Sequence, residues 1–153
     1  MDESAGIYAR ESDFLGRWIQ FGVAGERVLS VAFPTSPAAD AEPDHELFGR
    51  VFEYLEGVED DFADVRVALT MATDRRTVLE TAREIPYGEQ LSVERLVRRT
   101  PGLDADTEDD RELVRTALDE NPAPLFVPDH RVRDGPSAAP PEIEQKLRSL
   151  EGL

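Results

Sequence analysis

The sequence NPAPLFVPDHRV, at residues 121–132, holds the densest pattern of the chain together with side chains capable of chemistry. Its three prolines exclude a helix and favour an extended path, and the apolar run Leu-Phe-Val lies between the second and third of them. We therefore predict a buried, strand-like segment. It brings Asp129 and His130 to the end of an apolar passage, where burial perturbs the pKa of a carboxyl group or an imidazole.

Helical patterns lie on both sides of this segment. An apolar stripe with helical spacing runs over residues 78–85 and ends before Pro86. Ser92 is suited to cap the next, short helix, and a further helix is predicted over residues 108–119. A last helix is predicted near the C-terminus, with apolar positions at Ile143, Leu147 and Leu150.

The first third of the chain alternates apolar and polar residues as strands do. Residues 17–23 and 27–33 alternate, with a short turn between them, and residues 65–69 alternate again as a third strand. A helix is predicted over residues 44–55, with Asp44 as its N-cap. These patterns together predict an α+β fold, in which a small antiparallel sheet with one helix packs on a helical second half.

Two strings give the chain a family resemblance. PDHRV at residues 128–132 resembles the Pro-Cys-His-Arg-Val signature of the alkylguanine-DNA alkyltransferases, also called methylated-DNA–protein-cysteine methyltransferases, and IPYGE at residues 85–89 resembles a second string of that family. The resemblance implies a ribonuclease-H-like sheet-and-helix part over residues 1–70. It implies a DNA-binding and active-site-like domain over residues 71–153, with a winged-helix or helix-turn-helix-like motif. Asp129 stands in place of the acceptor cysteine, and the chain has no cysteine.

The resemblance also assigns residues to a degenerate catalytic site. In the family, the histidine beside the acceptor cysteine and a distant glutamate activate that cysteine. They correspond here to His130 and Glu151, and Asn121 opens the signature segment. The glycine-rich loop that lines the family's alkylguanine pocket is shortened and replaced by GPSAAPP at residues 135–141. We expect Asp129 to form a hydrogen-bonded or ion-paired cluster with His130 and Glu151, or else to accept an alkyl group itself.

The DNA-binding motif departs from the family at two positions. The family's minor-groove arginine corresponds to Glu112, although a one-residue shift would restore Arg111, and the tyrosine that helps to turn out the target nucleotide corresponds to Val93. A carboxylate at this place repels phosphate groups. The residues assigned to DNA contact are Arg95, Arg98, Arg111, Arg115, Arg131 and Ser92.

The charge of the chain is strongly negative. The formal net charge is -16, from 33 acidic and 17 basic residues, and Lys146 is the only lysine. A diffuse acid excess with almost no lysine is typical of proteins adapted to concentrated salt, so we expect a halophilic source. No apolar run is long enough to span a bilayer and no basic leader is present, which favours a cytoplasmic protein.

Three functions remain open. The first is recognition of alkylated guanine in DNA without repair, with alkylated double-stranded DNA and excision-repair proteins as partners. The second is an interaction or scaffold protein that has lost DNA binding, and the third is an alkyltransferase that uses Asp129 as acceptor. We expect no cofactor, no metal and a monomeric protein, and we expect no catalysis because the cysteine nucleophile is absent.

Overall fold

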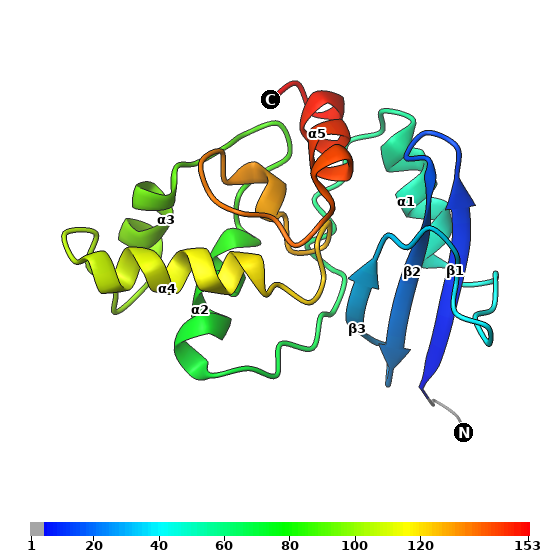
Figure 1. Ribbon diagram of the computed structural model, residues 1–153, viewed down its shortest axis with the longest axis horizontal. Helices are drawn as coiled ribbons and strands as arrows, with labels where there is room; N and C mark the ends of the chain where they lie inside the picture. Colours follow the sequence, from blue (N-terminus) through cyan, green and yellow to red (C-terminus); the bar gives the residue numbers. More distant parts are fainter. Residues whose placement is uncertain (1–4) are drawn as a thin grey trace.

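The computed structural model describes residues 5–153. A small sheet with one helix lies at one end of the molecule, and a group of helices lies at the other (Figure 1). The last helix and the turns before it lie between the two ends. The α+β fold predicted from the sequence is confirmed. No helix within the described residues is long and apolar enough to cross a membrane.

The sheet has three antiparallel strands in the order β1–β2–β3, which are β1 (Gly6–Ser12), β2 (Arg17–Ala24) and β3 (Arg27–Ala32). The predicted hairpin of β2 and β3 is confirmed. Its tight turn has positive φ angles at Gly25 and Glu26, as a two-residue hairpin loop with the right twist requires.

The structure differs from the sequence analysis at two strands. β1 was not predicted, because GIYARES lacks a clean alternation and joins the sheet only by pairing with β2. The predicted third strand over residues 65–69 is wrong. This stretch makes a single parallel bridge between Val67 and Val28 and then leaves the edge of the sheet.

Helix α1 (Leu47–Leu55) covers one face of the sheet, where Phe48 stacks on Phe21 with ring centroids 4.7 Å apart. The helix begins three residues later than predicted, and Asp44 is not its cap. The backbone N–H of Leu47 instead donates to Nδ1 of His45, at 3.1 Å. The first turn is therefore satisfied by an imidazole rather than by a carboxylate.

The second half contains four α-helices, as predicted: α2 (Thr73–Ala82), α3 (Val93–Arg99), α4 (Glu108–Asp119) and α5 (Pro141–Leu150). The Ser92 hydroxyl caps α3 by accepting from the backbone N–H of Arg95 at 3.1 Å, which confirms the predicted cap.

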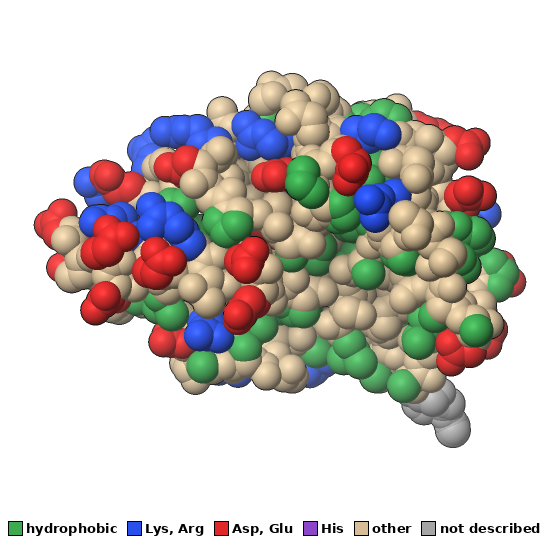
Figure 2. Space-filling view, viewed as in Figure 1, with side chains coloured by type: hydrophobic (Ala, Val, Ile, Leu, Met, Phe, Trp, Pro, Cys, Tyr) green, Lys and Arg blue, Asp and Glu red, His purple; other side chains and the backbone are tan. Residues whose placement is uncertain are grey.

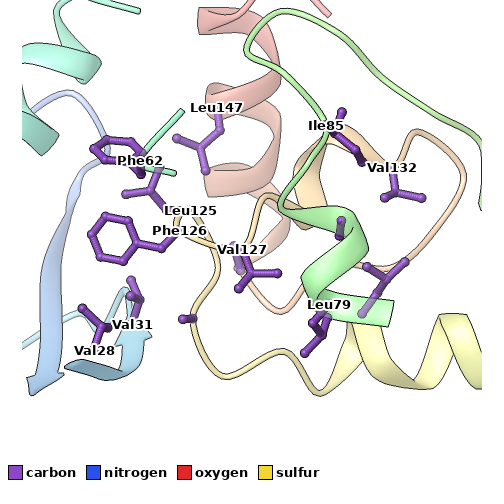
Figure 3. Packing of buried hydrophobic residues seen from close by; sticks show 14 of the residues in the cluster. Val28, Val31, Phe62, Leu79, Ile85, Leu125, Phe126, Val127, Val132 and Leu147 are labelled. Carbon is purple, nitrogen blue, oxygen red and sulfur yellow. The ribbon is translucent and has the colours of Figure 1, made fainter. Parts of the chain in front are cut away.

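One apolar core runs from the sheet into the helices. Phe126 lies at its centre (Figure 3), with its ring centroid 5.5 Å from that of Phe21 and 5.1 Å from that of Phe62. Arg83 links the chain after α2 to residues 62–65 and to Phe126, because it donates to the carbonyl oxygens of Phe62, Val65 and Phe126 at 2.8, 2.8 and 3.1 Å. The core thus continues across the boundary between residues 70 and 71.

The segment at residues 121–132 is buried, as predicted, but it is not strand-like. Its first part closes a tight turn, in which the Val127 N–H donates to the Ala123 carbonyl at 2.8 Å, and Leu125 has a φ of 88°. Its second part is the 3₁₀ turn η1 (Asp129–Arg131). Three prolines remove backbone N–H donors that the hydrogen bonds of a β-sheet would need, so the backbone forms hydrogen bonds within the segment and to the Asn121 side chain instead.

Candidate active site

Asp129 is buried at the start of η1, with only 1% of its surface exposed. One carboxylate oxygen accepts from the Ser137 hydroxyl at 2.6 Å. The other accepts from the Ala138 N–H at 2.8 Å and from Nδ2 of Asn121 at 3.0 Å. Burial raises the pKa of Asp129 above its ordinary value, while its three hydrogen bonds act in the opposite direction.

Residues 135–140 are held against this carboxylate. At the start of the loop, a Cβ added to Gly135 would lie 2.9 Å from Leu118 and 3.1 Å from Val132 and Val93, so a larger residue would force these side chains to shift. Near the end of the loop, Ala139 is buried. Asp129 therefore holds the middle of a loop that is already fixed at both ends.

Asn121 joins the end of α4 to the site. Its Oδ1 accepts from the Ala123 N–H at 3.0 Å, and its Nδ2 donates both to the Val127 carbonyl and to Asp129, each at 3.0 Å. The side chain thus closes the turn that precedes η1 and supplies one of the three donors to the carboxylate.

Glu151 follows α5 and forms a second buried network. Its carboxylate accepts from His130 Nε2 at 2.8 Å, from Arg131 Nε and Nη2 at 2.8 and 3.0 Å, from the Tyr54 hydroxyl, and from the Gly88 N–H at 3.1 Å. Burial favours a raised pKa, but the hydrogen bonds from His130 and Arg131 outweigh burial and hold the pKa of Glu151 well below its ordinary value. The group is ionised.

His130 has one engaged and one unengaged ring nitrogen. Because Glu151 is ionised and accepts, Nε2 of His130 carries the proton in this hydrogen bond. Nδ1 is buried and has no hydrogen-bond partner among the described residues. A proton on Nδ1 would be a buried donor without an acceptor among the described residues.

The three predicted site residues lie together but form two networks. His130 and Glu151 share one network, whereas Asp129 bonds to Asn121, Ser137 and Ala138 and makes no hydrogen bond to His130. The single cluster expected from the sequence is therefore divided.

Arg131 lies inside the protein, where its guanidinium bonds to Glu151 and donates to the Ile85 carbonyl at 2.7 Å. It is 2% exposed, which corrects the expected DNA contact, because a buried guanidinium paired with Glu151 does not reach a phosphate. Ser92 is also buried, and its hydroxyl is engaged in the α3 cap.

Sequence reasoning did not identify Tyr54 and Ser137 as members of the site. Tyr54 reaches Glu151 from the buried face of α1, 97 residues away. Its only signal is a phenol on an otherwise apolar helix face, because a buried hydroxyl requires a partner. Ser137 offered a similar signal, as the one hydroxyl within the proline- and alanine-rich loop.

The outward face of α4 is acidic. Glu112, which we expect at the place of the family's arginine, has 64% of its side chain exposed. Arg111 turns back to Glu108 at 2.7 Å and to the Ala105 carbonyl, and Arg115 pairs with Glu112 at 3.4 Å and with Glu108 at 3.5 Å. Glu112, and not Arg111, therefore projects from the helix.

The arginines of α3 lie on its exposed side. Arg98 pairs with Glu94 at 2.6 Å, whereas Arg95 has no carboxylate within 4.0 Å among the described residues. A surface hollow of about 650 Å³ lies elsewhere, between the β2–β3 turn, the start of α1 and residues 64–66. It includes none of the predicted site residues.

Comparison with known proteins gave similar sequences and structures. The chain is 33% identical over 129 residues to the methylated-DNA–protein-cysteine methyltransferase of Methanopyrus kandleri, a match that covers 81% of this chain and 93% of the relative. The crystal structure of the O6-methylguanine methyltransferase of Mycobacterium tuberculosis matches with a TM-score of 0.73 and 18% identity, over 97% of this chain and 91% of that one. No family model matches the chain.

Two further structures share the fold. The Mycobacterium tuberculosis OGT in complex with DNA matches with a TM-score of 0.72 and 20% identity, over 97% of this chain and 91% of that one. The O6-methylguanine-DNA methyltransferase of Pyrococcus kodakaraensis matches with a TM-score of 0.67 and 21% identity, over 97% and 99% of the two chains. Given the identity and coverage of the Methanopyrus relative, the chain belongs to the methylated-DNA–protein-cysteine methyltransferase family.

Proposed function

We propose that this protein recognises alkylated guanine in double-stranded DNA and does not take up the alkyl group. Family membership and the DNA-bound Mycobacterium tuberculosis neighbour support the choice of DNA as ligand. The observation that carries the proposal is the hydrogen bonding of Asp129, whose carboxylate is buried and accepts three hydrogen bonds where we expect the acceptor cysteine of the family.

The state of Asp129 argues against alkyl transfer. An acceptor must direct a lone pair at the alkyl carbon, and a carboxylate has about four lone-pair positions, of which three are directed at donors here. A carboxylate is also a weaker nucleophile than a thiolate, and each donor lowers its reactivity further. A buried, hydrogen-bonded carboxylate of this kind is better suited to stabilise the loop at residues 135–140 than to attack a substrate.

Recognition would use the donors that Asp129 holds now. Ser137, Ala138 and Asn121 converge on one point, and an incoming base that presents an oxygen or a ring nitrogen can accept from the same donors. Binding would therefore exchange an internal carboxylate for a base, which costs affinity but leaves the base unaltered.

The test compares two duplexes that differ by one O6-methylguanine. We expect preferential binding to the methylated duplex at moderate potassium chloride, weaker binding at multimolar salt, full recovery of the lesion, and no methyl adduct on the protein by intact mass spectrometry. Equal binding to both duplexes would contradict lesion recognition. A methyl adduct that is absent in Asp129→Asn would instead support Asp129 as acceptor.

The acidic face of α4 favours a second candidate. With Glu112 exposed and a net charge of -16, the surface repels a phosphate backbone, as expected for an interaction protein that has lost DNA binding. Absence of binding to either duplex at every salt concentration, for protein shown to be folded by circular dichroism, would favour this function.

Finer points of the proposal concern organisation and partners. We propose that α3 and α4, which pack on each other, form the helix-turn-helix. We also propose that the protein consists of two parts, residues 1–70 and 71–153. Its acidic composition would be an adaptation to salt. Excision-repair proteins are the proposed partners of a lesion-bound, monomeric protein, because bound DNA that is not repaired has to be passed on.

A further inference from the structure

Helix α3 presents arginines on one exposed side. Its apolar residues Val93, Leu96 and Val97 are buried, which leaves Arg95 and Arg99 outward. Residues four apart in a helix lie on the same side, so these two side chains leave α3 from the same side.

A third arginine is held beside this helix by backbone pairing. The Leu91 N–H donates to the Arg131 carbonyl, and the Arg133 N–H donates to the Leu91 carbonyl, both at 2.9 Å. The carboxylate of Asp134 accepts from the Val93 N–H at 2.7 Å. The exposed Arg133 is thereby fixed next to the start of α3 on a backbone with little freedom.

These three arginines differ from those around them in their pairing. Arg95, Arg99 and Arg133 have no carboxylate within 4.0 Å among residues 5–153, although acidic residues outnumber basic ones by 33 to 17. Basic side chains gather over α3 in Figure 2, and acidic ones over the neighbouring α4. On α3 and α4, by contrast, Arg98, Arg111 and Arg115 have acidic partners.

We infer that the α3 arginine face, defined as Arg95, Arg99 and Arg133, holds the phosphate backbone of duplex DNA, and that α4 does not lie deep in a groove. This inference rests on the proposed function and names the surface that performs it. An unpaired, exposed guanidinium contacts phosphate without first losing a protein carboxylate, whereas each arginine of α4 would have to leave its ion pair.

The acidic residues of α4 also disfavour insertion of that helix into a groove. Glu108, Asp109 and Glu112 are exposed on that helix, and a groove would bring them close to phosphates on both strands. Docking through the α3 arginine face keeps them at the edge of the duplex, where salt screens them within about 8 Å at physiological ionic strength.

The experiment compares charge-matched triple variants in the full chain. Arg95→Gln/Arg99→Gln/Arg133→Gln removes the face, and Arg27→Gln/Arg66→Gln/Arg76→Gln removes three exposed arginines elsewhere. Dissociation constants are measured on methylated and unmethylated duplexes over a range of potassium chloride concentrations. We expect the first variant to bind both duplexes about tenfold more weakly, with a log–log salt slope reduced by about 2.7, and the second to bind like wild type.

Failure of this inference is distinct from failure of the proposed function. If wild type prefers the methylated duplex but the first variant keeps its affinity and slope, the α3 arginine face is wrong and lesion recognition stands. If wild type binds both duplexes equally and the first variant binds weakly, the face stands and lesion recognition fails. If wild type binds no DNA, both fail. Thermal unfolding confirms that each variant is folded.

Discussion

The buried site and the surface of α4 differ in how closely they follow the family signature. Inside, His130 and Glu151, which we expect at the family's catalytic positions, are hydrogen-bonded to each other, whereas outside, Glu112 lies where we expect the family's arginine. The difference follows from solvation. Removing one partner of a buried charge leaves the other unpaired at a cost of about 3–5 kcal/mol, whereas an exposed charge contributes about 0–1 kcal/mol to stability. A change of function can therefore be made on the surface at little cost to the fold.

The substitution Asp129→Cys tests whether the interior has kept its catalytic potential. The new thiol would lie beside His130, whose Nδ1 has no hydrogen-bond partner among the described residues, and would release Ser137 and Ala138 for the base. We expect stoichiometric transfer of one methyl group from a methylated duplex to the protein, against none in wild type. Intact mass spectrometry measures the adduct.

Two controls limit the interpretation of that result. Asp129→Ser opens the same space without a thiol and should gain no adduct. Asp129→Cys with His130→Gln should react more slowly, because the adjacent base is lost. An unreactive Asp129→Cys protein that is folded would show that the loop at residues 135–140 excludes the base, so that the interior has lost its function as well.

Glu151→Gln tests the energetic side of the comparison. The change removes the negative charge that faces the buried Arg131, and we expect the free energy of unfolding to fall by about 3–5 kcal/mol in urea denaturation. Glu142→Gln is the matched control, because Glu142 pairs with Arg17 at the surface at 3.4 Å and should change stability by less than about 1 kcal/mol. Equal effects of the two substitutions would remove the proposed difference between interior and surface.

The parts of the fold that were predictable from the sequence are those with local causes. Ser92 caps α3 within its own turn, and the β2–β3 turn at Gly25 lies between adjacent strands. The site depends instead on distant pairs. Nothing near Arg131 in the sequence indicates that it pairs with Glu151 rather than with DNA, and nothing near Tyr54 indicates its hydroxyl partner 97 residues later.

The signature segment shows the same limit. Its prolines correctly excluded a helix, but the choice between an extended strand and a tight turn depends on where each backbone donor finds an acceptor. The Asn121 side chain stabilises the tight turn by hydrogen bonds to Ala123 and Val127. These bonds form only when α4 has folded and holds Asn121 in position. The family motif led to the expectation that Asp129 stands at the acceptor position, whereas nothing in the sequence indicated its three hydrogen-bond donors.

Acid unfolding of wild type and variants separates the two buried carboxylates. The pKa of Glu151 is lower in the folded than in the unfolded state, so its stabilisation is present above the unfolded pKa of about 4.5 and is lost as the pH falls below it. The pKa of Asp129 is raised, so its ionisation costs stability as the pH rises above about 3.8. The two carboxylates therefore have opposite pH dependences.

The variant Asp129→Asn should make this difference measurable. It removes the titration but places an amide donor against the donors that Asp129 accepts from, so we expect a loss of about 1–3 kcal/mol at pH 7. The loss becomes larger towards pH 4, because wild type gains stability as Asp129 is protonated and the variant does not. Urea denaturation at intervals of pH measures it. A loss that stays constant with pH would mean that Asp129 does not titrate in this range.

Glu112→Arg tests the surface half of the comparison, with the smallest expected effect. The change replaces a negative charge by a positive one at an exposed position and disrupts only the weak pair with Arg115, so stability should change by less than about 0.5 kcal/mol. If α4 lies at the edge of the duplex, the substitution should raise affinity for both duplexes by less than about fivefold, because its charge remains partly screened. A far larger gain, confined to the methylated duplex, would place α4 in the groove beside the lesion. In that case the buried site alone would account for the absence of alkyl transfer, and the acidic surface would only weaken the affinity for DNA.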